Sequence, residues 1–250
     1  MRNSLLASDE PPAVTALRRD GESDFVILVD HAGKLIPRSL DNLGLSDSEI
    51  GRHIGWDIGA FAVARLVSEK LDAALVAQTY SRLVIDCNRD PAHPTAMPAI
   101  SEVTEIPGNQ NLSEEDREAR RQAIFLPYQT YIADLLDERA RQGRKTILIA
   151  QHSMTPVYKG NHREMETAVL YNRDARFALP LKEALGATCA DNLPYAMTDD
   201  SDFTLPVHGE KRGLLHVGLE IRQDLVENEA GQLLWADHIA HALEKARSSF

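Results

Sequence analysis

The sequence predicts an α/β sandwich in which helices cover both faces of a mixed, mainly parallel sheet. Three observations support this fold class. Apolar runs at residues 25–29, 146–150 and 214–221 are typical of strands that are buried on both faces. Segments with helical capping signals and helical spacing alternate with these runs. A length of 250 residues suits a single domain with a large core, and we expect one domain over residues 1–250.

The strands are recognised as short runs of aliphatic and β-branched residues. Six are predicted, at residues 25–29, 74–79, 82–86, 146–150, 168–171 and 214–221. Tyr80 and Ser81 separate the second run from the third. Because strands and helices alternate, most neighbouring strands should be parallel, and the sheet should form the middle of three layers.

The helices are recognised by their caps and their apolar spacing. Four are predicted, at residues 46–71, 113–142, 173–185 and 233–247. Ser46 and Ser113 each open a capping motif at the start of the first two. Pro127 is expected to kink the second helix, and Pro180 to interrupt the third.

Two long polar segments separate these elements. Residues 91–111 contain four prolines and few large apolar residues, and long loops of this kind are usually functional or mobile. Residues 191–211 are also predicted to be a loop. Tyr195 and His208 within it are candidate substrate contacts.

The composition excludes several classes of partner. A net charge of -11 and a pI near 5.3 argue against nucleic acid or an anionic membrane. Cys87 and Cys189 lie far apart in the sequence, and we expect two reduced, buried thiols. Residues 1–12 lack the apolar core of a signal peptide, and no apolar run approaches the roughly 20 residues that span a bilayer. We therefore expect a cytoplasmic protein.

Two histidines stand in matching positions at the ends of buried strands. His31 follows the run at 25–29, and His152 follows the run at 146–150. Ligands of open α/β sheets gather at the carboxyl ends of strands. Zinc favours imidazole nitrogen and keeps three protein ligands in catalytic sites. A single histidine is often only a hydrogen-bonded structural residue, but the matched placement of two favours a zinc site.

Asp57 is the expected third ligand. It lies on the predicted helix 46–71, where a carboxylate on a buried face requires a partner. His53 lies four residues earlier, is expected to share with Asp57 the face next to the apolar one, and is the alternative. His53 could instead form a hydrogen bond that orients one of the metal ligands.

Glu220 is the candidate general base. It lies inside an apolar strand, where an unpaired carboxylate is costly, and near a metal it could accept a proton from water. The alternative is an ion pair with Arg222, two residues further along the same face. Ser153 lacks the Gly-x-Ser-x-Gly motif, which disfavours a serine hydrolase.

Arginines near the predicted site indicate an acidic substrate. Arg82 and Arg89 flank the apolar run at 82–86, and Arg222 follows Glu220. Guanidinium groups bind carboxylates through two parallel hydrogen bonds. Asn88 could add amide donors. The alternative for Arg89 is a structural ion pair with Asp86.

The residues that carry these predictions resemble the N-formylglutamate amidohydrolase family over about residues 25–225. Five motifs occur in the family's order: Asp-His-Ala at 30–32 with Ile-Pro at 36–37, Trp-Asp-Ile-Gly-Ala at 56–60, Tyr-Ser-Arg-Leu-Val-Ile-Asp-Cys-Asn-Arg at 80–89, His-Ser-Met-Thr-Pro at 152–156, and Leu-Glu-Ile-Arg-Gln-Asp-Leu at 219–225. The resemblance implies a zinc carboxypeptidase-like fold (also called phosphorylase/hydrolase-like), with a mixed sheet between helices and one catalytic zinc.

The resemblance also implies roles for single residues. His31 and His152 look like the histidine ligands, and Glu220 is similar to the glutamate that activates water in aspartoacylases. Arg82 and the Asn88–Arg89 pair look like the groups that grip a substrate carboxylate. One position departs from the carboxypeptidase pattern: Lys34 stands where those enzymes have a glutamate ligand.

We therefore expect a zinc-dependent amidohydrolase that acts on a small N-acyl, most simply N-formyl, acidic amino acid such as N-formyl-L-glutamate. A small peptidase on the same scaffold is the enzymatic alternative. A non-catalytic binding module for an acidic metabolite, in which Glu220 only pairs with Arg222, is the alternative from another class.

Overall fold

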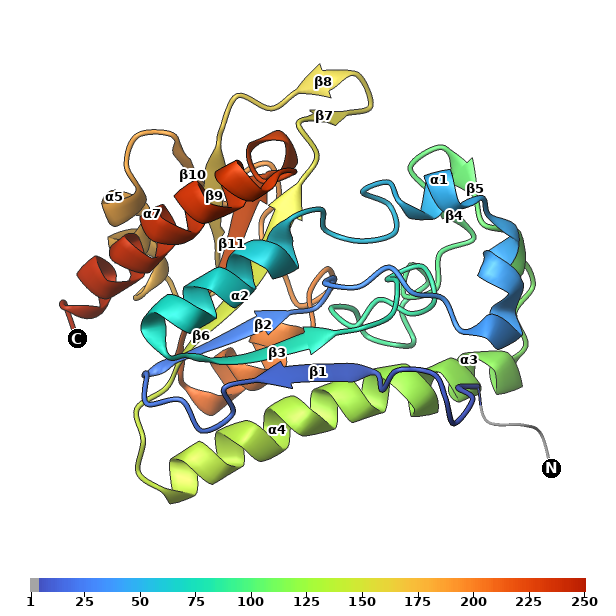
Figure 1. The fold of residues 1–250 in the computed structure, drawn as a ribbon, viewed down its shortest axis with the longest axis horizontal. Coiled ribbons are helices and arrows are strands. Elements are labelled where there is room, and N and C mark those ends of the chain that lie inside the picture. The colour runs from blue at the N-terminus through green and yellow to red at the C-terminus, as the bar shows by residue number, and fades with distance from the viewer. Residues whose placement is uncertain (1–4) are drawn as a thin grey trace.

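A seven-stranded sheet forms the centre of the computed structural model, which describes residues 5–250 (Figure 1). The strand order is β1-β3-β2-β6-β11-β9-β10. Their bounds are β1 Val14–Leu17, β2 Phe25–Val29, β3 Ala74–Gln78, β6 Ile147–Met154, β9 Thr167–Leu170, β10 Cys189–Asp191 and β11 Leu215–Arg222. The first four residues of the N-terminal segment considered above lie outside the described residues.

The sheet is mixed and mainly parallel, as the sequence predicts. Strands β3, β2, β6 and β11 run parallel to their neighbours in the centre. Strand β1 is antiparallel to β3 on one side, and β9 is antiparallel to β11 on the other. The short edge strands β1 and β10 were not expected, because four and three residues of mixed polarity give little periodic signal.

Helices cover both faces of the sheet and complete three layers (Figure 1). On one face lie α2 (Ala60–Leu71), α5 (Ala178–Leu185) and α7 (Glu229–Arg247), whose apolar residues share one core with the sheet. On the other lie α4 (Leu126–Arg141) and the short α6 (Thr204–His208). None of the helices in residues 5–250 combines the length and apolar character needed to cross a membrane.

The predicted helix over 46–71 is two helices with a glycine-containing turn between them. The capping box at Ser46 is present, but α1 spans only Asp47–Ile50 before the turn that leads to α2. A Cβ on Gly55 would lie 2.3 Å from the carbonyl oxygen of Ile50, and Gly59 has a φ of 79°. The backbone of the turn therefore follows a path that favours glycine and that a continuous helix cannot take.

The predicted strand over 82–86 is a buried turn. The Ser81 hydroxyl accepts a hydrogen bond from the backbone N–H of Leu83 at 3.2 Å and donates to the carbonyl of Gly55 at 2.8 Å. These bonds hold a tight local turn, which competes with an extended strand. The apolar side chains of residues 83–85 are buried in the core below, so the run is apolar for a reason other than sheet pairing.

The remaining helical predictions differ mainly at their ends. The predicted helix over 113–142 comprises α3 (Glu114–Arg120), a π-helical turn and α4. The turn directly precedes Pro127, which has no N–H to donate along the helix. Helix α5 begins at Ala178, later than predicted, so Pro180 lies in its first turn.

Two small hairpins project beyond the carboxyl ends of the central strands (Figure 1). One is formed by β4 (Ile100–Ser101) and β5 (Thr104–Glu105) within the predicted proline-rich loop. The other is formed by β7 (Val157–Tyr158) and β8 (Asn161–His162), which follow β6 directly.

Candidate active site

The candidate site lies where the central parallel strands end. His31 comes two residues after the end of β2. His152 lies inside β6 rather than after it, because β6 pairs with β11 as far as Met154. Glu220 is the direct partner of His152 in this parallel pair. The sheet therefore sets the spacing of His152 and Glu220, since adjacent strands lie about 4.8 Å apart.

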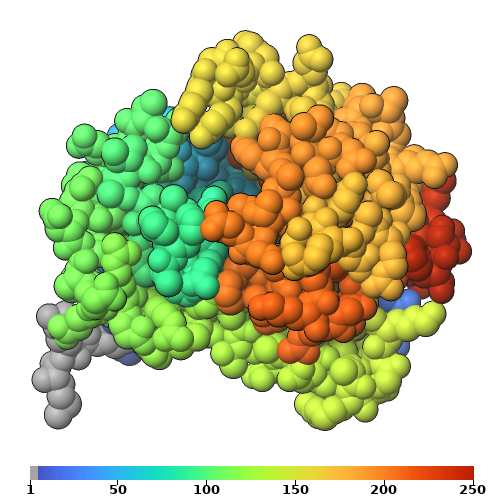
Figure 2. Space-filling model, turned by 180° about the vertical axis from the view of Figure 1, so that it is seen from behind, coloured from blue at the N-terminus to red at the C-terminus, as the bar shows by residue number. Residues whose placement is uncertain are grey.

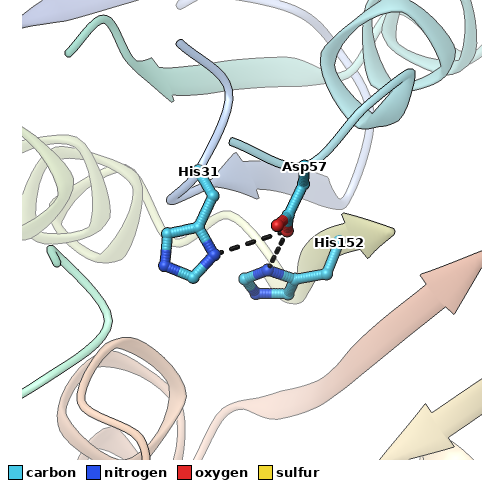
Figure 3. Close-up of side chains that lie close together, drawn as sticks. All are labelled: His31, Asp57 and His152. Carbon is cyan, nitrogen blue, oxygen red and sulfur yellow. Dashed lines mark hydrogen bonds and ion pairs between the residues drawn. The ribbon is translucent and has the colours of Figure 1, made fainter. Parts of the chain in front are cut away.

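His31, Asp57 and His152 form one buried cluster (Figure 3). One potential ligand atom from each lies within 4.8 Å of the others. Asp57 Oδ2 is 2.9 Å from His152 Nδ1 and 3.3 Å from His31 Nδ1. Asp57 reaches this point from the turn before α2, where its backbone N–H donates to the carbonyl of His31 at 3.0 Å.

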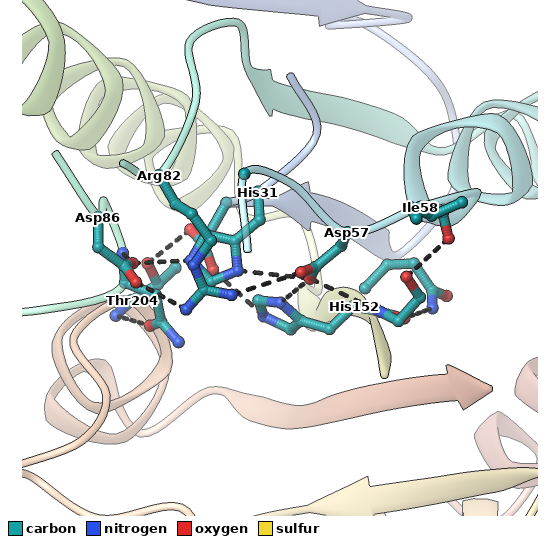
Figure 4. A network of polar contacts seen from close by, with 12 residues as sticks. His31, Asp57, Ile58, Arg82, Asp86, His152 and Thr204 are labelled. Atoms are coloured by element: carbon teal, nitrogen blue, oxygen red, sulfur yellow. Dashed lines mark hydrogen bonds and ion pairs between the residues drawn. The ribbon is translucent and has the colours of Figure 1, made fainter. Parts of the chain in front are cut away.

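The outer nitrogen of each imidazole faces a second carboxylate, and Figure 4 shows His31 beside one of them, Asp86. His31 Nε2 is 2.7 Å from Asp86 Oδ1, and His152 Nε2 is 3.5 Å from Asp30 Oδ2. Histidines that bind metals usually pass their other ring N–H to a carboxylate or carbonyl, which fixes the tautomer and the ring orientation. The two imidazoles are thus arranged to present Nδ1 to a cation, and two nitrogens with one carboxylate suit zinc.

The charges of the cluster alter the protonation of its members. Burial alone would lower the pKa of both histidines, but the facing carboxylates outweigh it and the pKa of each lies above its ordinary value. Burial likewise would raise the pKa of Asp57, but His31 and His152 hold it far below its usual range. Without a metal, the ionised carboxylates therefore favour the protonated form of both imidazoles.

The metal-free protein should lose stability as the pH rises above 6.5. The folded pKa values of His31 and His152 lie above the ordinary value of 6.5, so their stabilisation is complete below pH 6.5 and is lost as the pH rises through the folded values. Glu220, whose pKa burial raises to about 7, also loses its contribution to stability as the pH rises through about 7, whereas the lowered pKa of His208 acts in the opposite direction between about 4 and 6.5. Urea unfolding of the chelator-treated protein at pH 6.5 and 8.5 measures the effect.

The comparison has an internal control. The His152→Gln variant cannot gain or lose this proton, so its free energy of unfolding should change less between the two pH values. A metal-free wild type that is equally stable or more stable at pH 8.5 would contradict the charge state assigned to the cluster.

His53 is close to the cluster but is not part of it. It lies on the turn between α1 and α2, so it does not share a helix face with Asp57. Its Nε2 is 3.4 Å from Glu102 Oε2, on the β4–β5 hairpin side of the site. This pairing favours Asp57 over His53 as the third ligand.

Glu220 is a buried carboxylate whose Oε2 has no hydrogen-bond partner among the described residues. Burial raises its pKa, and although the charges of His152 and His31 lower it, the pKa is about 7. The alternative ion pair with Arg222 is not formed, because the Arg222 guanidinium binds Asp224 at 2.8 Å and the carbonyls of residues 163–165. Among residues 5–250, Glu220 has no ion-pair partner, and its side chain faces the cavity beside the cluster.

A cavity of about 620 Å³ opens above the cluster and Glu220. In the space-filling view it is a hollow between the green, yellow and orange parts of the surface (Figure 2). Arg82, Asn88, Arg89 and Tyr195, all predicted to contact substrate, are among the residues that line it. A volume of this size is typical of small-molecule sites.

The polar residues on the Asp86 side of the cavity already have protein partners. Arg82 Nη2 donates to Asp86 Oδ2 at 2.7 Å, and Arg89 Nε lies 3.7 Å from the same oxygen. The predicted structural pairing of Arg89 with Asp86 is thus present at long distance. Asn88 lines the cavity, but its amide donates to Asp202 at 3.0 Å and accepts from the backbone N–H groups of residues 203 and 204, so its polar atoms hold this segment.

Two predicted substrate contacts lie elsewhere. Arg222 ties β11 to the chain that precedes β9, as its contacts above show, and is not among the described residues that line the cavity. His208 is buried under the sheet, where its Nε2 is 2.7 Å from Gln129 Oε1. The prediction for His208 was wrong because residues 204–208 form helix α6 rather than an open loop.

Three residues were not assigned to the site from the sequence, where Asp86 was considered only as an ion-pair partner of Arg89. Asp30 and Asp86 face the outer nitrogens of the histidines, and each ends a buried apolar run, where a carboxylate requires a partner. That signal could have identified both. Arg163 carried no such signal, because its sequence neighbours are polar and its burial depends on the chain around it.

Three comparisons relate the chain to known proteins. The family model described as N-formylglutamate amidohydrolase matches residues 23–227. A crystal structure of a gene product from Agrobacterium tumefaciens is 40% identical, covers 98% of both chains and has a TM-score of 0.95. The N-formylglutamate amidohydrolase from Ralstonia eutropha JMP134 has the same fold at 17% identity, with 95% of this chain and 98% of that chain covered and a TM-score of 0.61. The comparison with curated proteins finds no match.

Proposed function

Because this chain belongs to the N-formylglutamate amidohydrolase family, we propose that it is a single-domain, zinc-dependent enzyme that hydrolyses the amide bond of a small N-acyl acidic amino acid, such as N-formyl-L-glutamate. One observation carries the proposal: a buried carboxylate oxygen of Glu220 without a partner faces the same cavity as a cluster of two imidazoles and a carboxylate. A carboxylate kept in such a place is costly unless it has a task.

His31, Asp57 and His152 would hold the zinc through the atoms that face one another in the cluster, which are Nδ1, Oδ2 and Nδ1. Bound there, zinc would polarise the acyl carbonyl and lower the pKa of water. Asp86 and Asp30 would hold the two imidazoles in the tautomer that leaves Nδ1 free to bind.

Glu220 would accept the proton of the attacking water and deliver it to the leaving amine. Its pKa of about 7, raised by burial, suits a group that both accepts and donates a proton near neutral pH. Arg82, 3.5 Å from Asp57 Oδ1, would donate to the acyl oxygen as it gains negative charge. Arg89 and Tyr195 would bind the amino-acid part of the substrate.

A panel of substrates tests this function directly. Purified protein should contain about one zinc per chain and should hydrolyse N-formyl-L-glutamate faster than its 5-amide or a formylated peptide. Chelation should abolish turnover, and zinc should restore it. Rates of hydrolysis of N-acetyl and N-succinyl glutamate show which acyl group the enzyme prefers. Rates with the corresponding aspartates show which length of amino-acid side chain it prefers.

The two alternatives give different results in the same panel. Preference for formylated or unmodified peptides would identify a small peptidase on this scaffold. Tight binding of an acidic metabolite without metal and without turnover would identify a binding module and would contradict the proposed function.

A further inference from the structure

Arg163 is a buried cation without a carboxylate partner. It follows the β7–β8 hairpin, and only 8% of its surface is exposed. Its Nη2 donates to the Tyr195 hydroxyl, and its Nη1 has no hydrogen-bond partner among residues 5–250. No ion pair to Arg163 is formed within this part of the chain.

Two aromatic rings frame the guanidinium. Its central carbon lies 4.8 Å from the centre of the Tyr195 ring and 5.5 Å from that of Tyr158. Cation–π contacts offset part of the cost of burying the charge, but they leave the Nη1 donors unused. A buried charged donor without an acceptor is costly, so an arginine in this setting is suited to receive an anion.

The position of Arg163 connects it with the catalytic cavity. Tyr158 and Tyr195 both line that cavity, together with Glu220. The pKa of Glu220 is raised by burial, and the charge of Arg163 is among those that lower it, so the guanidinium acts on the site from nearby. The backbone around it is fixed, since its N–H donates to the carbonyl of Pro156 at 2.9 Å and its carbonyl accepts from Arg222 Nη1 at 3.1 Å.

One arginine lies beside the cluster and another behind two tyrosines of the cavity wall. Arg82 lines the cavity, 3.5 Å from the proposed zinc ligand Asp57, and shares the carboxylate of Asp86 with Arg89. Arg163 is not itself among the described residues that line the cavity. It stacks against Tyr158 and Tyr195, which line it and are 36% and 43% exposed, so a ligand reaches the guanidinium where these side chains move aside. In an N-acyl amino acid the α-carboxylate is bonded to the carbon that carries the reacting nitrogen, so it must lie close to the cluster. A side-chain carboxylate lies further from it.

We propose that Arg163, framed by Tyr158 and Tyr195, binds the side-chain carboxylate of the substrate and thereby selects N-acyl dicarboxylic amino acids over neutral ones. This inference rests on the proposed function for the identity of the site, but it concerns the binding of the amino-acid part alone. It can therefore be tested without turnover.

The test measures the binding of L-glutamate and L-glutamine, which differ only at the side-chain terminus, to the zinc-loaded protein by calorimetry. The wild type should prefer L-glutamate. Arg163→Met should lower the affinity for L-glutamate by about 30-fold or more, because one partner of a buried charge pair is removed, and should leave L-glutamine nearly unchanged. Arg163→Lys should keep part of the preference, since it retains the charge but not the paired donors. Arg121→Met, which removes a partly exposed arginine that pairs with Glu118 outside the cavity, is the control.

Thermal unfolding separates a binding role from a structural one. If Arg163 binds a substrate carboxylate, the ligand-free Arg163→Met variant should melt at the same temperature as the ligand-free wild type or higher. L-glutamate should no longer raise the melting temperature of the variant. A lower melting temperature with an unchanged preference for L-glutamate would overturn the inference. So would an equal loss of affinity for both amino acids. Preference that depends on Arg163 in a protein without hydrolytic activity would refute the proposed function alone.

Discussion

Replacing Glu220 by Gln should lower kcat by about 10²–10⁴-fold, the usual loss when a general base is removed. The amide keeps the shape of the side chain but cannot accept a proton from water. The metal content should stay the same, since Glu220 is not part of the His31, Asp57 and His152 cluster. Steady-state kinetics with N-formyl-L-glutamate and metal analysis of the same sample measure both effects.

The fold of the variant should be intact or more stable. Glu220 is buried without a hydrogen-bond partner for Oε2, so a neutral amide removes the cost of a buried charge above pH 7, where the carboxyl is ionised. Glu118→Gln, which neutralises an exposed carboxylate on α3, is the control and should behave as the wild type. Activity of Glu220→Gln within a few-fold of the wild type would exclude Glu220 as the base, and loss of zinc would make it a ligand.

Replacing Asp57 by Asn should weaken zinc binding by more than about 100-fold, which exceeds the loss usual for residues behind a ligand. The change removes the charged oxygen that lies between both imidazoles. Activity should fall in parallel at low zinc. Competition with a chromophoric chelator gives the dissociation constant.

The matched comparison is His53→Gln. His53 pairs with Glu102 and lies outside the cluster, so its loss should change zinc affinity only a few-fold. A larger loss of zinc affinity in His53→Gln than in Asp57→Asn would assign the third ligand to His53. An unchanged zinc affinity in both variants would mean that the cluster does not bind the metal.

The sheet and its main helices could be predicted because their signals are local. A buried strand such as β2 is a continuous apolar run, and its bounds agree with the prediction. The carboxyl ends of such strands also indicated His31 and His152 as neighbours. Strand β6 extends further than predicted, to Met154, because Gln151, His152 and Ser153 are polar and are held in the sheet by β11.

The errors arise where distant parts of the chain decide the local structure. Asp57 was selected for its place on a helix, yet it lies on a turn whose path depends on glycines and on a hydrogen bond to His31, 26 residues away. The run at 82–86 is apolar because it is buried beneath the cavity, not because it is a strand. Arg163 acquires its role only from Tyr195, 32 residues later. Sequence patterns do not contain these contacts.

His152 and Glu220 are paired on adjacent strands, so the parts of the molecule that fix the proposed chemistry differ from the parts that form the rim of the cavity. The distance between the proposed ligand and the proposed base is fixed by the ladder of β6 and β11, which is buried and resists shear. The rim is made instead by the hairpins β4–β5 and β7–β8 and the segment around Tyr195, which contribute few residues to the core. An engineer could therefore exchange rim segments to alter selectivity while the proposed ligand and the proposed base stay in place.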